Sequence, residues 1–215
     1  MQQAMTAGTP AVASPRGKAR QAHLLAVACE HFLAHGYDGA SMDAIVAEAG
    51  GSKATLYRHF GSKQVLFVSC VGHLCDEFLA RLEGIDLSAP VFEDGLRVIL
   101  MELVEVMGSP RHVDFYRLVV AGSSLTEVGR AWFEHGPKVW HRLIARLIAR
   151  HVTQGSLPEA AGRASAAPGM IFDCLFSHLA IESVILGRRI DRRGVAARVD
   201  EIVSRARGLL LAQPV

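Results

Sequence analysis

Apolar residues recur at helical spacing along the chain, and alternating runs of the kind that form strands are scarce. The first long pattern covers about Lys18 to His35 and stops at Gly36, a residue suited to a left-handed helix end. The second begins at Lys63 and ends near Gly84, where a loop to Pro90 follows. The pattern therefore predicts an all-α protein.

Two short helical patterns lie between the long ones, over about residues 41–60. The first has apolar residues at i, i+3, i+4 and i+7, which make one buried stripe: Met42, Ile45, Val46 and Ala49. In the second, Leu56 and Phe60 are four apart and face inward. Gly50 can end the first helix and Ser52 can cap the second. Two short helices joined by a tight turn form a helix-turn-helix, whose second helix can enter a major groove of DNA.

The outer side of the second short helix suits contacts with DNA. Lys53 follows the cap Ser52, and Lys63 follows a similar cap, Ser62, so each cation lies at a helix N-terminus, which disfavours it. A phosphate there would satisfy the lysine and the free N–H groups together. The alternative for either lysine alone is a solvated surface residue. The residues expected at DNA are Ser41, Ser52, Lys53, Ala54, Thr55, Tyr57, Arg58, His59 and Lys63.

These motifs belong to a longer set of residues at fixed spacing, over about 20–68: Leu24, Leu25, Ala28, Phe32, Gly36, Tyr37, Ser41, Met42, Ile45, Val46, Ala49, Gly50, Ser52, Lys53, Thr55, Leu56, Tyr57, Phe60, Ser62 and Lys63. With them the segment resembles the N-terminal domain of TetR/AcrR-type transcriptional regulators. Gly51 departs from that pattern, which usually has a small β-branched or aliphatic residue there. The resemblance implies a three-helix helix-turn-helix domain, residues 18–66, followed by a larger helical ligand-binding and dimerisation domain, residues 67–215.

Seven further segments organise this second domain. Helical patterns cover about 91–107, 111–121, 125–134 and 138–152, the stretch 158–168 is ambiguous, and strong patterns cover 169–186 and 192–212. The helix over 169–186 is apolar on too many faces to serve only its own core. We expect the last two helices to form a homodimer interface, a four-helix bundle across a two-fold axis. The alternative is that both pack on the core of the monomer.

Aromatic residues are concentrated behind the helix-turn-helix. We expect a pocket for a small apolar effector in the C-terminal domain, lined by some of Phe115, Trp132, Trp140, Phe172 and Phe176. The alternative is that these side chains form an ordinary packed core. An effector there would move the helix that begins at Lys63 and change the separation of the two recognition helices in a dimer, which must be about 34–36 Å to meet successive major grooves.

Charge and cysteine usage limit the other possibilities. The formal net charge is +2, so DNA affinity has to come from a local patch. Residues 1–17 are expected to form a disordered tail, and Arg16, Lys18 and Arg20 a flexible basic arm, without the apolar region of a signal peptide. No CxxC motif occurs, so the four cysteines, Cys29, Cys70, Cys75 and Cys174, are expected to be buried free thiols in the cytoplasm. No run of eighteen apolar residues predicts a membrane span.

No catalytic, cofactor or metal motif is found in the sequence. His178 and Glu182 are four apart on one helix, but an ordinary histidine of a helix bundle is the more frequent arrangement. We therefore expect a homodimeric repressor that a small apolar ligand releases from operator DNA, with no cofactor and no enzymatic activity. The alternatives are a helical carrier or enzyme with a non-functional DNA-binding domain, and a DNA-binding protein that responds to no ligand.

Overall fold

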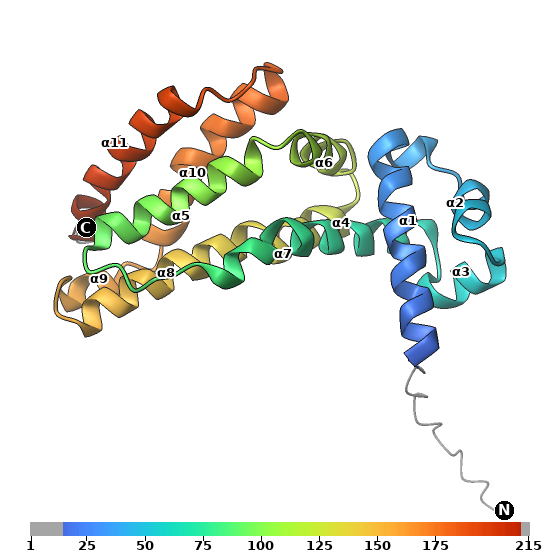
Figure 1. The fold of residues 1–215 in the computed structure, drawn as a ribbon, viewed down its shortest axis with the longest axis horizontal. Coiled ribbons are helices and arrows are strands. Elements are labelled where there is room, and N and C mark those ends of the chain that lie inside the picture. Colours follow the sequence, from blue (N-terminus) through green and yellow to red (C-terminus); the bar gives the residue numbers. More distant parts are fainter. Residues whose placement is uncertain (1–14, 212–215) are drawn as a thin grey trace, which may run out of the picture.

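The structure is a computed structural model that describes residues 15–211. This range forms helices and no strand, which confirms the all-α prediction. The elements are α1 (Pro15–Gly39), α2 (Met42–Ala49), α3 (Lys53–Phe60), α4 (Lys63–Leu79), η1 (Ala80–Gly84), α5 (Phe92–Met107), α6 (Pro110–Ala121), α7 (Thr126–His135), α8 (Pro137–Thr153), α9 (Glu159–Arg163), α10 (Ala167–Ala180), the π-helical turn η2 (Ile181–Ile185) and α11 (Arg192–Leu211). Figure 1 shows a small lobe, α1–α3, joined by α4 to a large lobe, α5–α11.

The small lobe follows local signals in the sequence. The helical conformation of α1 is interrupted at Gly36, where φ is 69°, close to the predicted helix end. The three short connections that follow each end in a serine whose side chain accepts a hydrogen bond from the new helix: Ser41 from Ala44, Ser52 from Thr55 and Ser62 from Val65. These caps fix where α2, α3 and α4 begin.

The hydrophobic core of the small lobe is continuous with part of the large lobe. Leu24, Phe32 and Leu56 are buried in one cluster with residues of α4, and the cluster continues to Phe115 on α6 and Val128 on α7. A second cluster joins α5, α8, α10 and α11. The two sets of helices are therefore coupled through packed side chains on both sides of α4.

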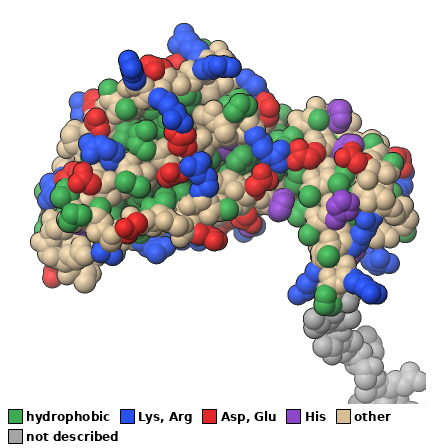
Figure 2. Space-filling model, viewed as in Figure 1, with side chains coloured by type: hydrophobic (Ala, Val, Ile, Leu, Met, Phe, Trp, Pro, Cys, Tyr) green, Lys and Arg blue, Asp and Glu red, His purple; other side chains and the backbone are tan. Residues whose placement is uncertain are grey.

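Two expectations from the sequence are wrong. Arg16, Lys18 and Arg20 lie in α1 and do not form a flexible arm, because the helix begins at Pro15, a residue suited to the first turn. Of the tail expected over residues 1–17, residues 15–17 are helical, and residues 1–14 lie outside the described range. Cys174 is exposed, unlike the three other cysteines, because nothing in the monomer covers its side of α10. Figure 2 shows basic side chains at the end of the small lobe where α1 begins.

The last two helices divide their apolar residues between the core and the surface. The stripe of α11, which includes Val199 and Val203, packs against α5 within the monomer. On α10, Leu179 is also fully buried. By contrast, Met170, Ile181 and other apolar residues of the α10–η2 segment are exposed. The apolar surface available to a partner is therefore narrower than the sequence pattern predicts.

The segment Ala167–Ile185 is long and apolar enough to cross a membrane by length and composition alone. Only 39% of its apolar window is buried inside the protein. This finding qualifies the expectation that no segment could span a membrane. The same composition is also required of a helix that packs on its own core with one side and on a second chain with the other.

Candidate nucleic-acid interface

The candidate recognition helix is α3, eight residues that follow the cap Ser52 and end before Gly61. Leu56 is fully buried and Phe60 is nearly so, which holds the helix to the lobe on one side. On the opposite side, Tyr57 is 43% exposed and Arg58 is exposed as well. A helix anchored on one face in this way presents its other face to a groove.

The remaining residues predicted to bind DNA surround this face. Ser41, Ser52, Lys53 and Ala54 are exposed, while Thr55, His59 and Lys63 are half-buried. The hydroxyl groups of Ser52 and Thr55 lie 3.1 Å apart and hydrogen-bond to each other. These residues lie at the start of α2, along α3 and at the start of α4. That they form one DNA-binding surface stays a prediction.

Both lysines at helix N-termini have partners that the sequence did not reveal. The ammonium nitrogen of Lys53 lies 2.7 Å from a carboxylate oxygen of Asp43 on α2, and this contact raises the pKa of Lys53. The ammonium of Lys63 donates to the backbone oxygen of Asp38 at 3.2 Å and lies 4.9 Å from the ring centre of Tyr37. Neither cation needs a phosphate to be satisfied, so a DNA contact would compete with these interactions.

Arg20 was expected in a flexible arm, but it lies in α1 and contacts the helix-turn-helix. Its guanidinium donates to the backbone oxygen of Ala49, the last residue of α2, at 2.8 Å. A Cβ atom at Gly51 would lie 2.5 Å from the guanidinium Nη2, and Gly51 has φ +113°. Arg20 therefore lies over the turn between α2 and α3. The departure from the family pattern at Gly51 was the sequence signal that could have pointed to it.

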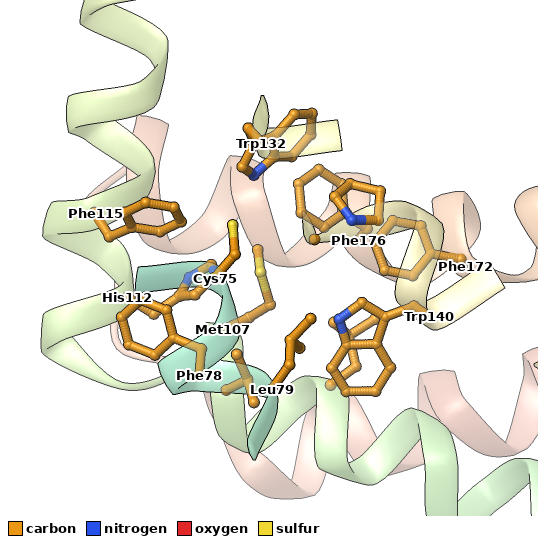
Figure 3. A pocket seen from close by; sticks show the side chains of 14 residues that line it. Cys75, Phe78, Leu79, Met107, His112, Phe115, Trp132, Trp140, Phe172 and Phe176 are labelled. Carbon is orange, nitrogen blue, oxygen red and sulfur yellow. The ribbon is translucent and has the colours of Figure 1, made fainter. Parts of the chain in front are cut away.

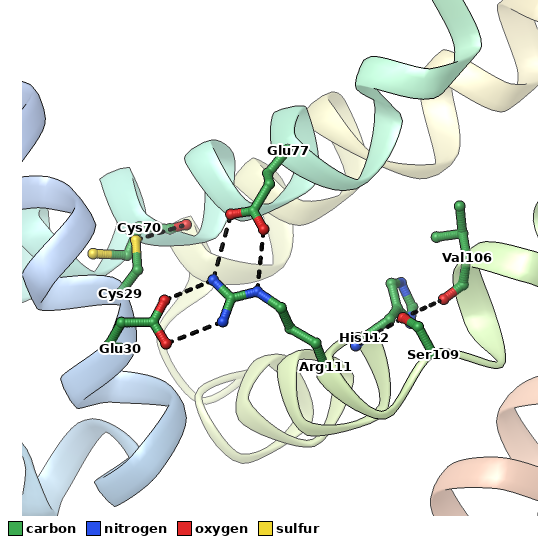
Figure 4. A network of polar contacts seen from close by, with 8 residues as sticks. All are labelled: Cys29, Glu30, Cys70, Glu77, Val106, Ser109, Arg111 and His112. Carbon is green, nitrogen blue, oxygen red and sulfur yellow. Dashed lines mark hydrogen bonds and ion pairs between the residues drawn. The ribbon is translucent and has the colours of Figure 1, made fainter.

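A three-way ion pair connects the small lobe to the large one (Figure 4). Arg111, near the start of α6, donates to both carboxylate oxygens of Glu30 on α1, at 2.6 and 3.0 Å. It also donates to both oxygens of Glu77 on α4, at 3.1 and 3.4 Å. The guanidinium lowers the pKa of Glu30 by hydrogen bonding. We call these three residues the Arg111 clamp.

The five aromatic residues predicted to line a pocket do surround a single cavity (Figure 3). Phe115, Trp132, Trp140, Phe172 and Phe176 come from four different helices and meet beside α4. The cavity has a volume of about 30 Å³. That space suffices for about one or two water molecules and is well below the roughly 300 Å³ of a typical ligand pocket. In this structure the site is too small for such a ligand.

His112 is a polar residue of this cavity that the sequence analysis did not single out. It follows Arg111 on α6, is only 7% exposed, and packs against the rings of Phe78 and Phe115, with centroids 5.0 and 5.7 Å away. Its Nδ1 atom is buried without a hydrogen-bond partner. Burial lowers the pKa of His112 to about 4, so the imidazole is neutral near pH 7. An unpartnered polar atom in an aromatic cavity is costly unless something binds to it.

The capped, anchored and outward-facing α3 defines a helix-turn-helix DNA-binding protein. Residues 24–70 match the family described as bacterial regulatory proteins, tetR family, and residues 94–204 match the AefR-like transcriptional repressor C-terminal domain. An HTH-type transcriptional regulator of Mycobacterium tuberculosis is 30% identical over 189 residues, which cover 86% of each chain. The chain belongs to the TetR family of transcriptional regulators, and it is not an enzyme.

Solved structures share the fold over nearly the whole chain. A TetR-family transcriptional regulator from Mesorhizobium loti has a TM-score of 0.78 at 24% identity, covering 91% of this chain and 98% of that one. The flavonoid-responsive regulator FrrA has a TM-score of 0.68 at 23% identity, covering 90% and 96%. At these identities the likeness concerns the fold alone.

Proposed function

We propose that the chain represses transcription as a homodimer bound to a palindromic operator, and that a small apolar effector releases it. The observation that carries the DNA-binding part is the outer face of α3, where Tyr57 and Arg58 are exposed while Leu56 and Phe60 anchor the helix. Tyrosine and arginine side chains on a recognition helix can contact phosphates and base edges. A protein that acts on the chromosome in this way works in the cytoplasm.

The exposed apolar surface of α10, η2 and α11 supports the homodimer. Ile181 is 51% exposed and Ile185 is 70% exposed, and a groove between α10 and α11 is lined by Met170, Ile202 and Leu209. A second copy related by a two-fold axis would cover this surface with the same residues. The dimer would also place two α3 helices on one duplex, provided that they lie about 34–36 Å apart.

Effector release is supported by the position of α6. One residue of this helix, His112, lies at the aromatic cavity, and the preceding residue, Arg111, holds α1 and α4. A molecule that enlarged the cavity would displace α6 and, through the Arg111 clamp, alter the orientation of the small lobe. Release requires that the effector bind this altered arrangement better than the DNA-bound one.

A second candidate function is a repressor that responds to no ligand. The observation that favours it is the size of the cavity, about 30 Å³, which is a packing defect rather than an open pocket. The two functions share the same DNA-binding surface, and they differ in whether the aromatic cavity opens. Binding of small aromatic molecules to the isolated protein separates them.

The test of the DNA-binding surface is a titration of operator DNA at fixed salt, with a duplex selected from a random library by the wild-type protein. Tyr57→Ala and Arg58→Ala should each weaken specific binding by about 1–3 kcal/mol, since each removes a contact from the groove-facing side of α3. Arg117→Ala is the control, because Arg117 is an exposed arginine of α6, far along the chain from α3. Wild-type affinity in both α3 variants would contradict the proposal.

A further inference from the structure

We propose that the aromatic cavity binds an uncharged aromatic molecule with a hydroxyl group, and that this hydroxyl donates a hydrogen bond to Nδ1 of His112. This inference rests on the effector-responsive function proposed above and names the chemical class of the effector. It is drawn from the charge, the shape and the unpartnered polar atom of the cavity.

Within residues 15–211, the side chains that line the cavity carry no charge, which favours an uncharged ligand. None of the described residues that line it is a lysine, arginine, aspartate or glutamate. The two lining residues that could titrate are both neutral near pH 7: burial lowers the pKa of His112 to about 4 and raises that of Cys75 to about 12. A carboxylate or ammonium group would lose its hydration here without gaining a counter-charge, which is strongly unfavourable.

The rings that form the wall favour a flat molecule. Phe172 lies nearly parallel to Phe176, with centroids 5.1 Å apart and planes at 19°, and Trp140 lies nearly parallel to Phe172 at 28°. Phe78, Phe115 and Trp132 complete the set. Figure 3 shows these rings on opposite sides of the central space. An aromatic molecule between them could form offset stacks and edge contacts with several rings at once.

The polar group of the molecule is assigned from His112. Its Nδ1 is buried and has no partner, and the imidazole is held in place by edge contacts with Phe78 and Phe115. In the neutral tautomer that carries its proton on Nε2, Nδ1 is an acceptor. A hydroxyl of a bound molecule would satisfy it. An otherwise identical molecule without a hydroxyl would leave it unsatisfied, which gives the site a basis for discrimination.

The outer wall of the cavity can open without unfolding a helix. Trp132 and Phe176 are half-buried and form a three-ring cluster with Tyr116, with centroid separations of 5.4 to 5.8 Å. These three side chains come from α7, α10 and α6, and each reaches solvent. Rotation of Trp132 and Phe176 would therefore widen the space beside His112 toward the surface. Widening has to accompany binding, because the cavity holds only about 30 Å³.

Three probes of matched shape test the inference: 2-naphthol, naphthalene and 2-naphthoate. Their affinities for the full chain are measured by calorimetry at pH 7.5, where only the naphthoate is charged. 2-Naphthol should bind about tenfold more tightly than naphthalene, the difference that one hydrogen bond to a buried acceptor produces. 2-Naphthoate should bind more weakly than either. The comparison needs no DNA, so its failure is distinct from failure of the operator titration.

Two variants locate the preference. His112→Phe keeps a ring of similar size and removes the acceptor, so the affinity for 2-naphthol should fall to that for naphthalene. His141→Phe is the matched control: His141 also has a buried, unpartnered nitrogen and packs edge-on against Phe172, but it does not line the cavity. This variant should retain the tenfold preference.

Histidine side-chain ¹⁵N spectra of the wild-type protein give a measurement that does not depend on a variant folding. The Nδ1 signal of His112 should shift on addition of 2-naphthol and stay in place with naphthalene. Equal or tighter binding of 2-naphthoate, a preference that survives His112→Phe, or an unmoved His112 signal would overturn the inference. So would failure of all three probes to bind up to their solubility limits.

Discussion

At the scale of single residues, the turn of the helix-turn-helix depends on the pairing of Arg20 with Gly51. The guanidinium bonds to the end of α2 and occupies the space where a side chain of residue 51 would stand. Gly51 also has φ +113°, a conformation that L-residues rarely adopt. The glycine is therefore required both by its backbone and by its neighbour.

Gly51→Ala should consequently destabilise the protein by about 1–3 kcal/mol, the usual cost of forcing a side chain into such a backbone conformation. Gly129→Ala is the matched control. Gly129 lies within α7 with nothing within 4 Å of its Cβ position, so the same substitution should stabilise by about 0.5–1 kcal/mol. Urea unfolding of both variants measures the two free energies. An equal stabilisation by both would show that the turn does not have this conformation.

At the scale of elements, α6 is the helix through which the cavity and the small lobe communicate. It bears His112 on the side of the cavity and Arg111 on the side of α1 and α4. Side chains of the clamp are partly exposed, so its contribution to overall stability is expected to be small, about 1 kcal/mol or less. The clamp matters because it joins α6 to α1 and α4.

Arg111→Met should release α1 from α6 with little change in the midpoint of global unfolding, because methionine keeps the apolar stem and removes the charge. Amide hydrogen exchange in α1 around Glu30 should become faster, since local opening no longer breaks an ion pair. Arg117→Met, on the same helix, should leave this exchange unchanged because Arg117 pairs only within α6, with Asp114 at 3.4 Å. Identical exchange in α1 of all three proteins would argue against coupling through the clamp.

At the scale of the whole molecule, the exposed apolar side of α10 and η2 should bind a second copy. Ile181→Glu places a charge on that surface and should convert dimers to monomers, as measured by sedimentation at micromolar concentration. Val65→Glu is the control, since Val65 in the first turn of α4 has the same 51% exposure as Ile181 but does not belong to the α10–η2 surface. A wild-type monomer, or equal effects of both variants, would contradict the proposed interface.

Local sequence signals predicted the helices and the position of α3. The side-chain partners and the cavity volume could not be predicted, because they depend on packing between helices that are distant in the sequence. The cap Ser52 and the spacing of Leu56 and Phe60 are properties of one short segment, so the position of α3 could be read from them. The partner of Lys53 lies on another helix, as does the ring that Lys63 covers, and no local pattern indicates either. The five aromatic residues named from the sequence all line one small cavity, but its volume depends on how their side chains pack, which the sequence does not show.

The shared core around α4 has a consequence for anyone who wishes to exchange sensing modules between such regulators. A junction at residue 66 would separate Phe67 and Leu74 from Phe32, Leu56 and the other groups that they bury with, and would remove Phe115 and Val128 altogether. The transplanted fragment, residues 1–66, would expose the apolar side chains that α4, α6 and α7 cover in the native protein. A chimera that keeps α4, α6 and α7 with the first three helices would preserve the native packing. Because α5 lies between α4 and α6 in the chain, no single junction achieves this, and the residues to keep have to be chosen by their contacts.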